Sequence, residues 1–167
     1  MPASRERTAR PYTRIRHPTY HRDDTRGKNS RVTASLPRIV RRRSRVHGFG
    51  VFAAEPINKN RRIVEYAGEL IRNAESERRE HRYLADGCIW VFQVNRAWSR
   101  DASVGGNIAR FINHSCTPNC YFEVVDKTIW IRAARNIRRG EELTYDYKVI
   151  GERTIPCRCR AGCPNRL

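Results

Sequence analysis

The sequence is poor in acidic residues and has no long hydrophobic run. Its 167 residues include 34 Lys and Arg against 17 Asp and Glu, a formal charge of +17. No stretch approaches the roughly 20 apolar residues of a membrane span. The opening MPASRERTAR also lacks the apolar core of a signal peptide. We therefore expect an intracellular protein without membrane contact, cytoplasmic if bacterial and nuclear if eukaryotic.

Apolar periodicity is nearly absent from the first quarter of the chain, which holds most of the net positive charge. Up to Arg45 there are 14 basic and 3 acidic residues, an excess of 11 charges. Such a composition cannot bury enough surface to offset the entropy lost on folding. We expect residues 1–36 to form a mainly disordered basic arm. It either contacts nucleic acid nonspecifically or is a solvated tail.

Internal repeats and parallel βαβ alternation are also absent, which disfavours a Rossmann-type methyltransferase or dehydrogenase. Short runs typical of strands are found instead, and they occupy residues 38–72, 88–95 and 120–147. Residues 120–137 read as a hairpin with Asp126 and Lys127 at its tip, and a turn and a final strand follow over residues 138–147. Residues 73–85 read as the one clear helix, residues 96–106 as a loop, and residues 107–115 as a segment with a short helical turn. The pattern predicts a compact β-rich domain from about residue 37 to the end.

Six cysteines in a chain expected to be reduced argue for free thiols or metal ligands and against disulfides. Three of them cluster near the end as Cys157-x-Cys159-x3-Cys163. Three thiols suit tetrahedral zinc, but a closed structural site needs a fourth ligand. The candidates for that ligand are His114, Cys116 and Cys120. The alternative is three uncoordinated thiols, and Cys88 is expected to be an ordinary buried residue.

Two further motifs are weak when taken singly. Gly48 and Gly50 in HGFGVF allow close approach of the backbone to a ligand, although the motif alone favours a plain hairpin turn. GEELTYDY places Tyr145, Asp146 and Tyr147 near a strand end. The phenols can orient an amine or simply pack, and Asp146 is either a general base or a turn acceptor.

The order of these segments is more specific than any one of them, and it resembles the SET-domain family of protein-lysine N-methyltransferases. The matching segments are HGFGVFA, IVEYAGELI, DASVGGNIARFINHSCTPNC, GEELTYDY and the Cys-rich tail. The resemblance implies a mainly β (β+α) fold of several small sheets with a knot-like C-terminal crossing. It also implies a catalytic SET domain over residues 37–150 and a post-SET-like zinc-binding tail over residues 151–167.

The resemblance implies S-adenosyl-L-methionine as the methyl donor. The cofactor-binding positions that follow are Gly48, Phe49, Gly50, Tyr66, Arg110, Asn113, His114 and Tyr147. His114 then holds the cofactor and is not a zinc ligand. The implied zinc ligands are Cys116, Cys157, Cys159 and Cys163. This tail is one residue shorter than the family's usual C-x-C-x4-C spacing.

The implied reaction is in-line attack of a lysine ε-amine on the sulfonium methyl inside an aromatic channel. Tyr147 and Tyr145 are the expected catalytic residues, and Asp146 takes no direct proton role. The expected channel residues are Trp90, Phe92 and Tyr145. Many relatives have a tyrosine where this chain has Trp90. The Tyr145 hydroxyl leaves less room for a methylated nitrogen, which predicts mono- or dimethylation.

The expected partner is a protein that presents a lysine, such as a histone or a nucleic-acid-associated basic protein. Acidic residues beside the groove would attract a basic tail, and the candidates are Glu75, Glu77, Glu80 and Asp86. The competing function is a basic, zinc-containing module that binds nucleic acid or protein and retains a vestigial cofactor pocket. The sequence does not distinguish a monomer from a homodimer.

Overall fold

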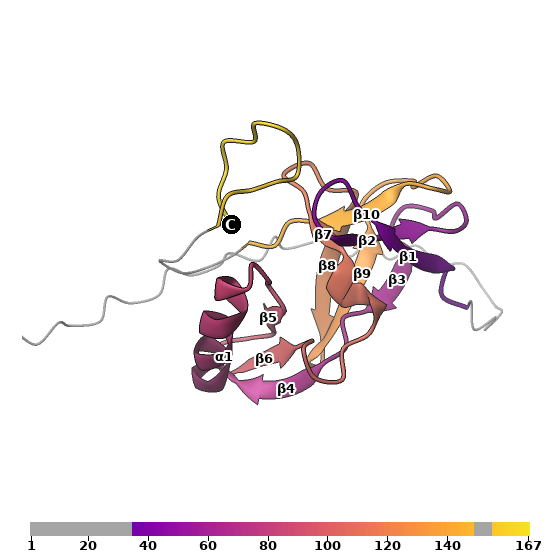
Figure 1. The fold of residues 1–167 in the computed structure, drawn as a ribbon. Coiled ribbons are helices and arrows are strands. Elements are labelled where there is room, and N and C mark those ends of the chain that lie inside the picture. The colour runs from indigo at the N-terminus through magenta and orange to yellow at the C-terminus, as the bar shows by residue number, and fades with distance from the viewer. Residues whose placement is uncertain (1–34, 149–154) are drawn as a thin grey trace, which may run out of the picture. The chain divides into compact units, whose positions relative to one another are not determined.

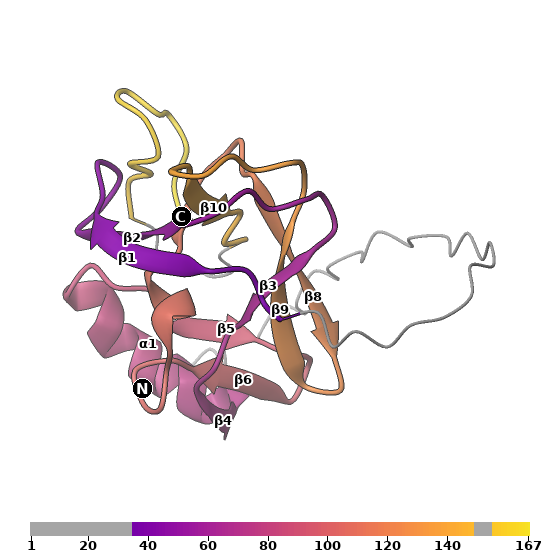
Figure 2. The ribbon, with the colours of Figure 1, turned by 90° about the vertical axis from the view of Figure 1, so that its right-hand side faces the viewer.

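A computed structural model describes residues 35–148 and 155–167 (Figures 1 and 2). Strands dominate the described residues, beside one α-helix and one short 3-10 helix. In chain order the elements are β1 (Ile39–Arg43), β2 (Phe49–Ala53), β3 (Arg62–Glu65), β4 (Glu69–Arg72), α1 (Asn73–Ala85), β5 (Val91–Gln93), β6 (Trp98–Asp101), η1 (Ile108–Phe111), β7 (Asn113–His114), β8 (Cys120–Val125), β9 (Thr128–Ala133) and β10 (Glu142–Tyr145). The predicted arm, apart from its last two residues, lies outside the described residues. So do residues 149–154, which begin shortly after GEELTYDY, where the family resemblance implies the knot-like crossing.

The described strands form three small sheets. Their strand orders are β1-β2-β10-β7, β3-β9-β8 and β4-β6-β5. All paired strands are antiparallel except β7 and β10, which run parallel. The prediction of a mainly β fold built from several small sheets is therefore confirmed.

The core is built from β-branched and other aliphatic side chains where the sheets meet. Strand β9 alternates strictly, so that Ile129, Ile131 and Ala133 are buried while the residues between them are half-buried. Ile63 in β3 and Leu143 in β10 are also almost completely covered. Each large aliphatic side chain buried in this way contributes about 2 kcal/mol. This packing fixes β10, and with it the site described below, against the rest of the domain.

Helix α1 covers the small sheet β4-β6-β5, as Figure 1 shows. It spans Asn73–Ala85, the range that the sequence predicts. Arg79 on this helix contacts Glu75 one turn away, Glu69 in β4 and Asp101 in β6, at 2.6–2.8 Å. Asp101 is fully buried, so the arginine joins helix and sheet through a covered ion pair.

The predicted loop over residues 96–106 is wrong in its first half. Residues Trp98–Asp101 form β6, the central strand of its sheet, which pairs with both β4 and β5. Ser99 and Asp101 are buried there, because Ser99 donates to Asn73 Oδ1 at 2.8 Å and Asp101 accepts from Arg79. Polar residues that are buried by distant partners give no local strand signal.

Other boundaries also differ from the prediction. The apolar run RRIVEYAGELI, in which Gly68 indicates a bend, divides there into β3 and β4, which belong to different sheets. The predicted strand over residues 88–95 shortens to Val91–Gln93, and Cys88 is half-buried rather than buried. The predicted hairpin tip is confirmed, since Asp126 and Lys127 both have positive φ, 47° and 64°, as a two-residue turn requires.

None of the helices in the described residues is both long enough and apolar enough to cross a membrane.

Candidate functional site

The short parallel pair β7–β10 brings together two segments about 30 residues apart in the sequence. Thr144 lies opposite Asn113, and Tyr145 lies opposite His114. The backbone N–H of Ser115 extends the pairing by donating to the Tyr145 carbonyl at 3.2 Å. The asparagine and histidine of RFINHSC therefore lie against the tyrosines of GEELTYDY.

The side chain of Asn113 ties this pair to the turn between β1 and β2. Its Nδ2 lies 3.0 Å from the Phe49 carbonyl, 3.4 Å from the His47 carbonyl and 2.8 Å from Glu142 Oε1. Gly48 within the turn has a φ of +45°, a conformation that a residue with a side chain rarely adopts. The structure thus brings Phe49 and Asn113, both expected to bind the cofactor, into direct contact.

Gly50 is buried beside the same carboxylate, and a Cβ at this position would overlap Glu142 Oε1. The glycine therefore allows Glu142 to reach across β2, where it accepts from Ser44 Oγ and Asn113 Nδ2 at 2.8 Å each. The role of Gly50 in this arrangement is to admit the group that orients Asn113.

His114 is buried and joins the tyrosine segment to the cysteine cluster. Its Nδ1 accepts the backbone N–H of Tyr147 at 3.2 Å, and its Nε2 lies 3.3 Å from Cys116 Sγ. Burial lowers the pKa of His114, and Asp146 at 3.7 Å only partly opposes this effect. The ring is therefore neutral near pH 7, and because Nδ1 is an acceptor, its proton resides on Nε2 and faces the sulfur.

Aromatic rings from four separate segments form one continuous cluster. Phe92 is its centre, with ring centroids 5.3 Å from Tyr66, 4.7 Å from Phe122 and 5.7 Å from Tyr145. Tyr145 continues the cluster to Tyr147, 4.9 Å away. The expected channel residues Phe92 and Tyr145 thus lie together with two expected cofactor-binding tyrosines.

The hydroxyl groups of this cluster have defined roles. Tyr147 donates to the Ile112 carbonyl at 2.8 Å, and Tyr66 donates to the Trp90 carbonyl at 3.0 Å. Each phenol has used its only proton, so its oxygen is free only to accept. For Tyr145, no hydroxyl partner is found among the described residues. Burial raises the pKa of all three phenols well above 10, so they remain neutral over the physiological range.

Arg110 has the one buried side-chain polar atom without a partner in the described residues, its Nε. Its Nη1 donates to the Ala102 carbonyl at 3.1 Å. The guanidinium lies over the rings of Trp90 and Phe111, at 4.8 and 5.0 Å from their centroids. Arg110 and Phe111 also line a hollow of about 530 Å³. A buried cationic N–H without an acceptor indicates a place for an anionic ligand group.

Four cysteines and one histidine gather where the C-terminal segment returns to the domain. This segment is the yellow loop above β7 and β10 in Figure 1. Cys116 Sγ lies 3.8 Å from the sulfurs of both Cys157 and Cys163. The ligand atoms of His114, Cys116, Cys157 and Cys159 lie within 4.8 Å of one another. A hydrogen bond from the backbone of Cys116 lowers the pKa of Cys159 to about 7, which favours its thiolate. This group could hold a metal ion.

Cys120, the other candidate from RFINHSCTPNC, lies elsewhere. It is 1% exposed in the core, and burial raises the pKa of its thiol to about 12. The two cysteines of that stretch therefore have different environments, one beside the tail thiols and one among aliphatic side chains.

Residues that hold the site in place were missed by sequence reasoning. Glu142 orients Asn113, and Asn119 bridges the same strand by donating to the Glu142 carbonyl and accepting from the Thr144 N–H, at 2.8 and 2.9 Å. Both lie within quoted motifs, GEELTYDY and NHSCTPNC. Only the closeness of β10 and the segment after β7 shows that their polar groups meet.

Comparison with proteins of known sequence gives close relatives. The chain is 45% identical over 135 residues to a "Histone-lysine N-methyltransferase, H3 lysine-4 specific" of Yarrowia lipolytica, a match that covers 75% of this chain and 12% of the relative. It is 41% identical over 145 residues to histone-lysine N-methyltransferase ATXR7 of Arabidopsis thaliana, covering 83% of this chain and 10% of that protein. The chain thus spans only about a tenth of the length of these relatives.

Solved structures and a family model agree with these matches. Polycomb repressive complex 2 of Chaetomium thermophilum, solved in an autoinhibited conformation bound to S-adenosylmethionine, matches with a TM-score of 0.63 and 32% identity, over 70% of this chain and 16% of that chain. The family model of the SET domain matches residues 48–148, more than half of the chain. The prediction made from the order of the motifs is confirmed, and the chain belongs to the SET domain family.

Proposed function

We propose that this protein transfers a methyl group from S-adenosylmethionine to the ε-amine of a lysine in a protein. The observation that carries the proposal is the β7–β10 pairing, which joins Asn113 and His114 to Tyr145 and Tyr147. Relatives about 45% identical to this chain are histone-lysine methyltransferases, which supports the same reaction class. A domain with a vestigial pocket would have no need to keep these polar contacts of Asn113 and His114 in its small core, so their presence favours a working site.

The chemistry of the residues at this site fits S-adenosylmethionine. Its methionine part carries a carboxylate, and Arg110 offers a buried N–H that lacks an acceptor. A carboxylate at that position would form a charge-assisted hydrogen bond while Trp90 and Phe111 exclude water from the guanidinium. Asn113 fixes the backbone turn at Phe49 on which the cofactor would rest. When bound, S-adenosylmethionine supplies a methyl group activated by a positively charged sulfur.

The aromatic cluster prepares the lysine to react. At pH 7 the removal of a proton from an ordinary lysine costs about 4–5 kcal/mol. Contact with Tyr66, Phe92 and Tyr145 removes water from the amine, and desolvation lowers the pKa of a cationic group. Tyr147 Oη, whose proton is donated to Ile112, accepts a hydrogen bond from the amine and thereby aligns its lone pair. Asp146 is half-buried beside His114 Nδ1, at 3.7 Å, and is assigned no proton-transfer role.

Tyr145 sets the number of methyl groups in this proposal. Its hydroxyl lies in the aromatic cluster, where it holds either the amine or one water molecule. A second or third methyl group must displace that contact, so we expect mono- or dimethylated lysine. Trp90 cannot supply a second phenol, and its indole packs against Tyr83 and Arg110.

The cysteine cluster is proposed to hold one structural zinc ion through Cys116, Cys157, Cys159 and Cys163. Cys163 is included because its sulfur lies 3.8 Å from Cys116 Sγ, as near as that of Cys157. His114 is assigned to the outer shell, since its Nε2–H faces Cys116 and a protonated nitrogen cannot ligate. Asn165 gives the same sulfur a second N–H donor at 3.1 Å.

The proposed substrate is histone H3, on the basis of the relatives whose names specify H3 lysine 4. The acidic residues expected to attract a basic tail are not equivalent. Glu75 is held by Arg78 and Arg79 at 2.6–2.8 Å, so its charge is already compensated. Glu80 is a better candidate, although burial raises its pKa.

The test is to incubate the full chain with isotope-labelled S-adenosylmethionine and recombinant H3, and to identify labelled residues by mass spectrometry. The proposal predicts label on lysine ε-nitrogens, as one or two methyl groups. Isothermal titration with S-adenosylmethionine distinguishes the proposed enzyme from the alternative, a binding module. A binding module with a vestigial pocket would bind nucleic acid and give no heat with this cofactor, which would refute the proposal.

A further inference from the structure

A second surface of the domain carries arginines that no carboxylate among the described residues neutralises. These exposed residues come from β1, the β1–β2 turn and the turn before β10, and they are Arg41, Arg42, Arg43, Arg45, Arg138 and Arg139. We call this set the arginine edge. None of its members forms an ion pair within the part of the chain that the structure describes.

The carboxylates nearby already have other partners. Glu55 pairs with Arg38 at 2.8 Å, and Glu141 pairs with Arg135 at 2.7 Å. Glu141 also accepts the backbone N–H of Arg138, at 2.7 Å. The positive charge of the arginine edge therefore faces solvent.

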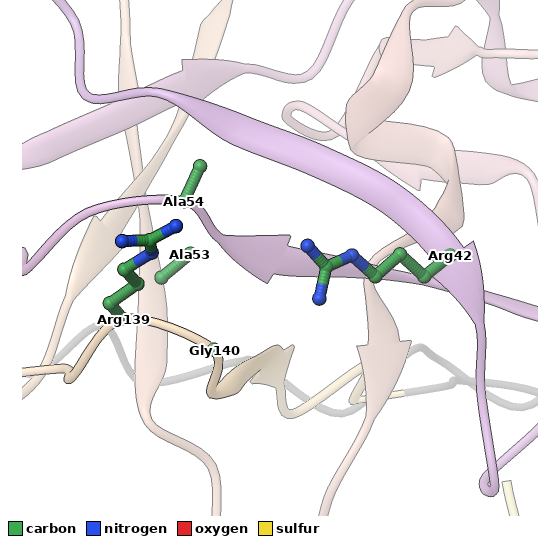
Figure 3. A pocket seen from close by; sticks show the side chains of 5 residues that line it. All are labelled: Arg42, Ala53, Ala54, Arg139 and Gly140. Carbon is green, nitrogen blue, oxygen red and sulfur yellow. The ribbon is translucent and has the colours of Figure 1, made fainter.

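Two members of the arginine edge line one hollow. Figure 3 shows the side chains of Arg42 and Arg139 beside Ala53, Ala54 and Gly140, in a hollow of about 330 Å³. Its lining contains no carboxylate and no large apolar side chain. Protein partners are usually anchored by aromatic or large apolar groups in a pocket, and such an anchor would find no matching surface here. Guanidinium groups around an otherwise small-residue wall suit phosphate oxygens instead.

We propose that the arginine edge binds the phosphate backbone of double-stranded DNA. Strand β1 is at the edge of its sheet, and successive side chains along a strand point to opposite faces. Arg41 and Arg43 accordingly share one face, over Phe49, while Arg42 lines the hollow with Arg139. Each strand of duplex DNA presents a continuous row of phosphates, so these exposed guanidinium groups can neutralise several phosphates at once.

The aromatic side chain on this surface favours duplex over single-stranded DNA. Phe49 is exposed, but Arg41 and Arg43 lie over its ring at 4.8 and 4.5 Å, and Phe111 meets it edge-on. The ring is thus already in contact with two guanidinium groups and a second ring, which base stacking, the contact that single-strand binding requires, would have to displace. The proposal is independent of the methyl-transfer reaction.

The test is fluorescence anisotropy of a labelled DNA duplex with the full chain over a series of salt concentrations. The test variant is Arg42→Gln with Arg139→Gln. The matched control is Arg38→Gln with Arg135→Gln, which removes the same charge from two exposed arginines that are ion-paired. Each lost phosphate contact reduces the slope of log K against log salt by about 0.9. We expect the test variant to lose between one and two units of slope, and the control to lose much less.

Equal changes in slope for both variants would overturn the proposal, because they would show that only net charge matters. So would a smaller effect on duplex than on single-stranded DNA, or displacement of the duplex by inorganic phosphate at constant ionic strength. Charged edge strands also prevent aggregation. If the Gln variant aggregates, Arg42→Lys with Arg139→Lys keeps the charge, and this second variant must retain most of the wild-type slope if the proposal is correct.

Discussion

The Nδ1 atom of His114 accepts the backbone N–H of Tyr147 at 3.2 Å. This bond fixes the proton of the imidazole on Nε2, which faces Cys116 Sγ. One neutral histidine thus connects the tyrosine segment proposed for catalysis with the thiols proposed for zinc. Loss of the metal is therefore expected to disturb the tyrosines through His114.

The zinc ligands are predicted to be four sulfurs. The full chain should contain one zinc ion per molecule, and Cys163→Ser should remove it, because three thiolates leave the tetrahedral site open. Metal content by mass spectrometry checks this, with Cys88→Ser as the control, since the Cys88 thiol donates to the Asp86 carbonyl and is not among the clustered thiols. Retention of stoichiometric zinc by Cys163→Ser would instead assign His114 as the fourth ligand.

Arg110→Gln is predicted to weaken S-adenosylmethionine binding by about tenfold or more, because a hydrogen bond to a charged group contributes about 1.5–3 kcal/mol. Isothermal titration measures the change. Arg72→Gln is a matched control, since Arg72 also stacks on an indole, that of Trp98, at 4.0 Å. Equal affinity of the Arg110 variant and the wild type would show that Arg110 does not hold the cofactor.

Asp101→Asn is predicted to lower the free energy of unfolding by about 3 kcal/mol, because it breaks a buried pair with Arg79. Burial raises the pKa of Asp101, but hydrogen bonds from Ser103, Arg79 and Tyr83 outweigh it, and the net pKa is lowered. A lowered folded-state pKa stabilises the protein above the unfolded value, near 3.9, and that stability is lost as pH falls through the folded value.

Denaturant melts at pH 7 and at pH 3 measure both effects. The wild type should lose stability between these values, and the Asp101 variant should lose less. Glu55→Gln, at the exposed pair with Arg38, should change little at either pH. Equal acid sensitivity of the wild type and the Asp101 variant would contradict this account of the carboxylate.

Tyr145→Phe is predicted to shift the product towards trimethyllysine, because it removes the hydroxyl that competes with added methyl groups for space. Mass spectrometry of the methylated peptide gives the distribution. Tyr121→Phe, at a tyrosine exposed on β8, should leave the distribution unchanged. Predominantly trimethylated product from the wild type would contradict the role of Tyr145.

Sequence signals predicted the elements that are defined by residues close to one another in the chain. Helix α1 was found from its charges and length, and the β8–β9 hairpin from the turn at Asp126 and Lys127. Strand β6 was missed, because Ser99 and Asp101 are polar and are buried with the help of partners on α1. The partners of a buried polar residue are set by the tertiary fold, so its burial cannot be read from its neighbours in the sequence.

The same limit applies to the site. The order of the motifs indicated the family and the residues Asn113, His114 and Tyr147. It did not show that Glu142 orients Asn113 or that His114 links two sites, because those contacts span about 30 residues. The short helical turn predicted within residues 107–115 is confirmed by η1, but strand β7 at the end of that segment was not predicted, since it is defined only by its pairing with β10.

The central claim is that distant segments meet to aim a neutral lysine amine at the methyl donor, and Tyr147→Phe tests it most directly. The variant and the wild type are compared for S-adenosylmethionine affinity and for the rate of methyl transfer to lysine in a single turnover. The account predicts similar affinity and a transfer rate lower by about 100-fold, because the phenol oxygen aligns the amine. An unchanged transfer rate, with the fold intact, would contradict it.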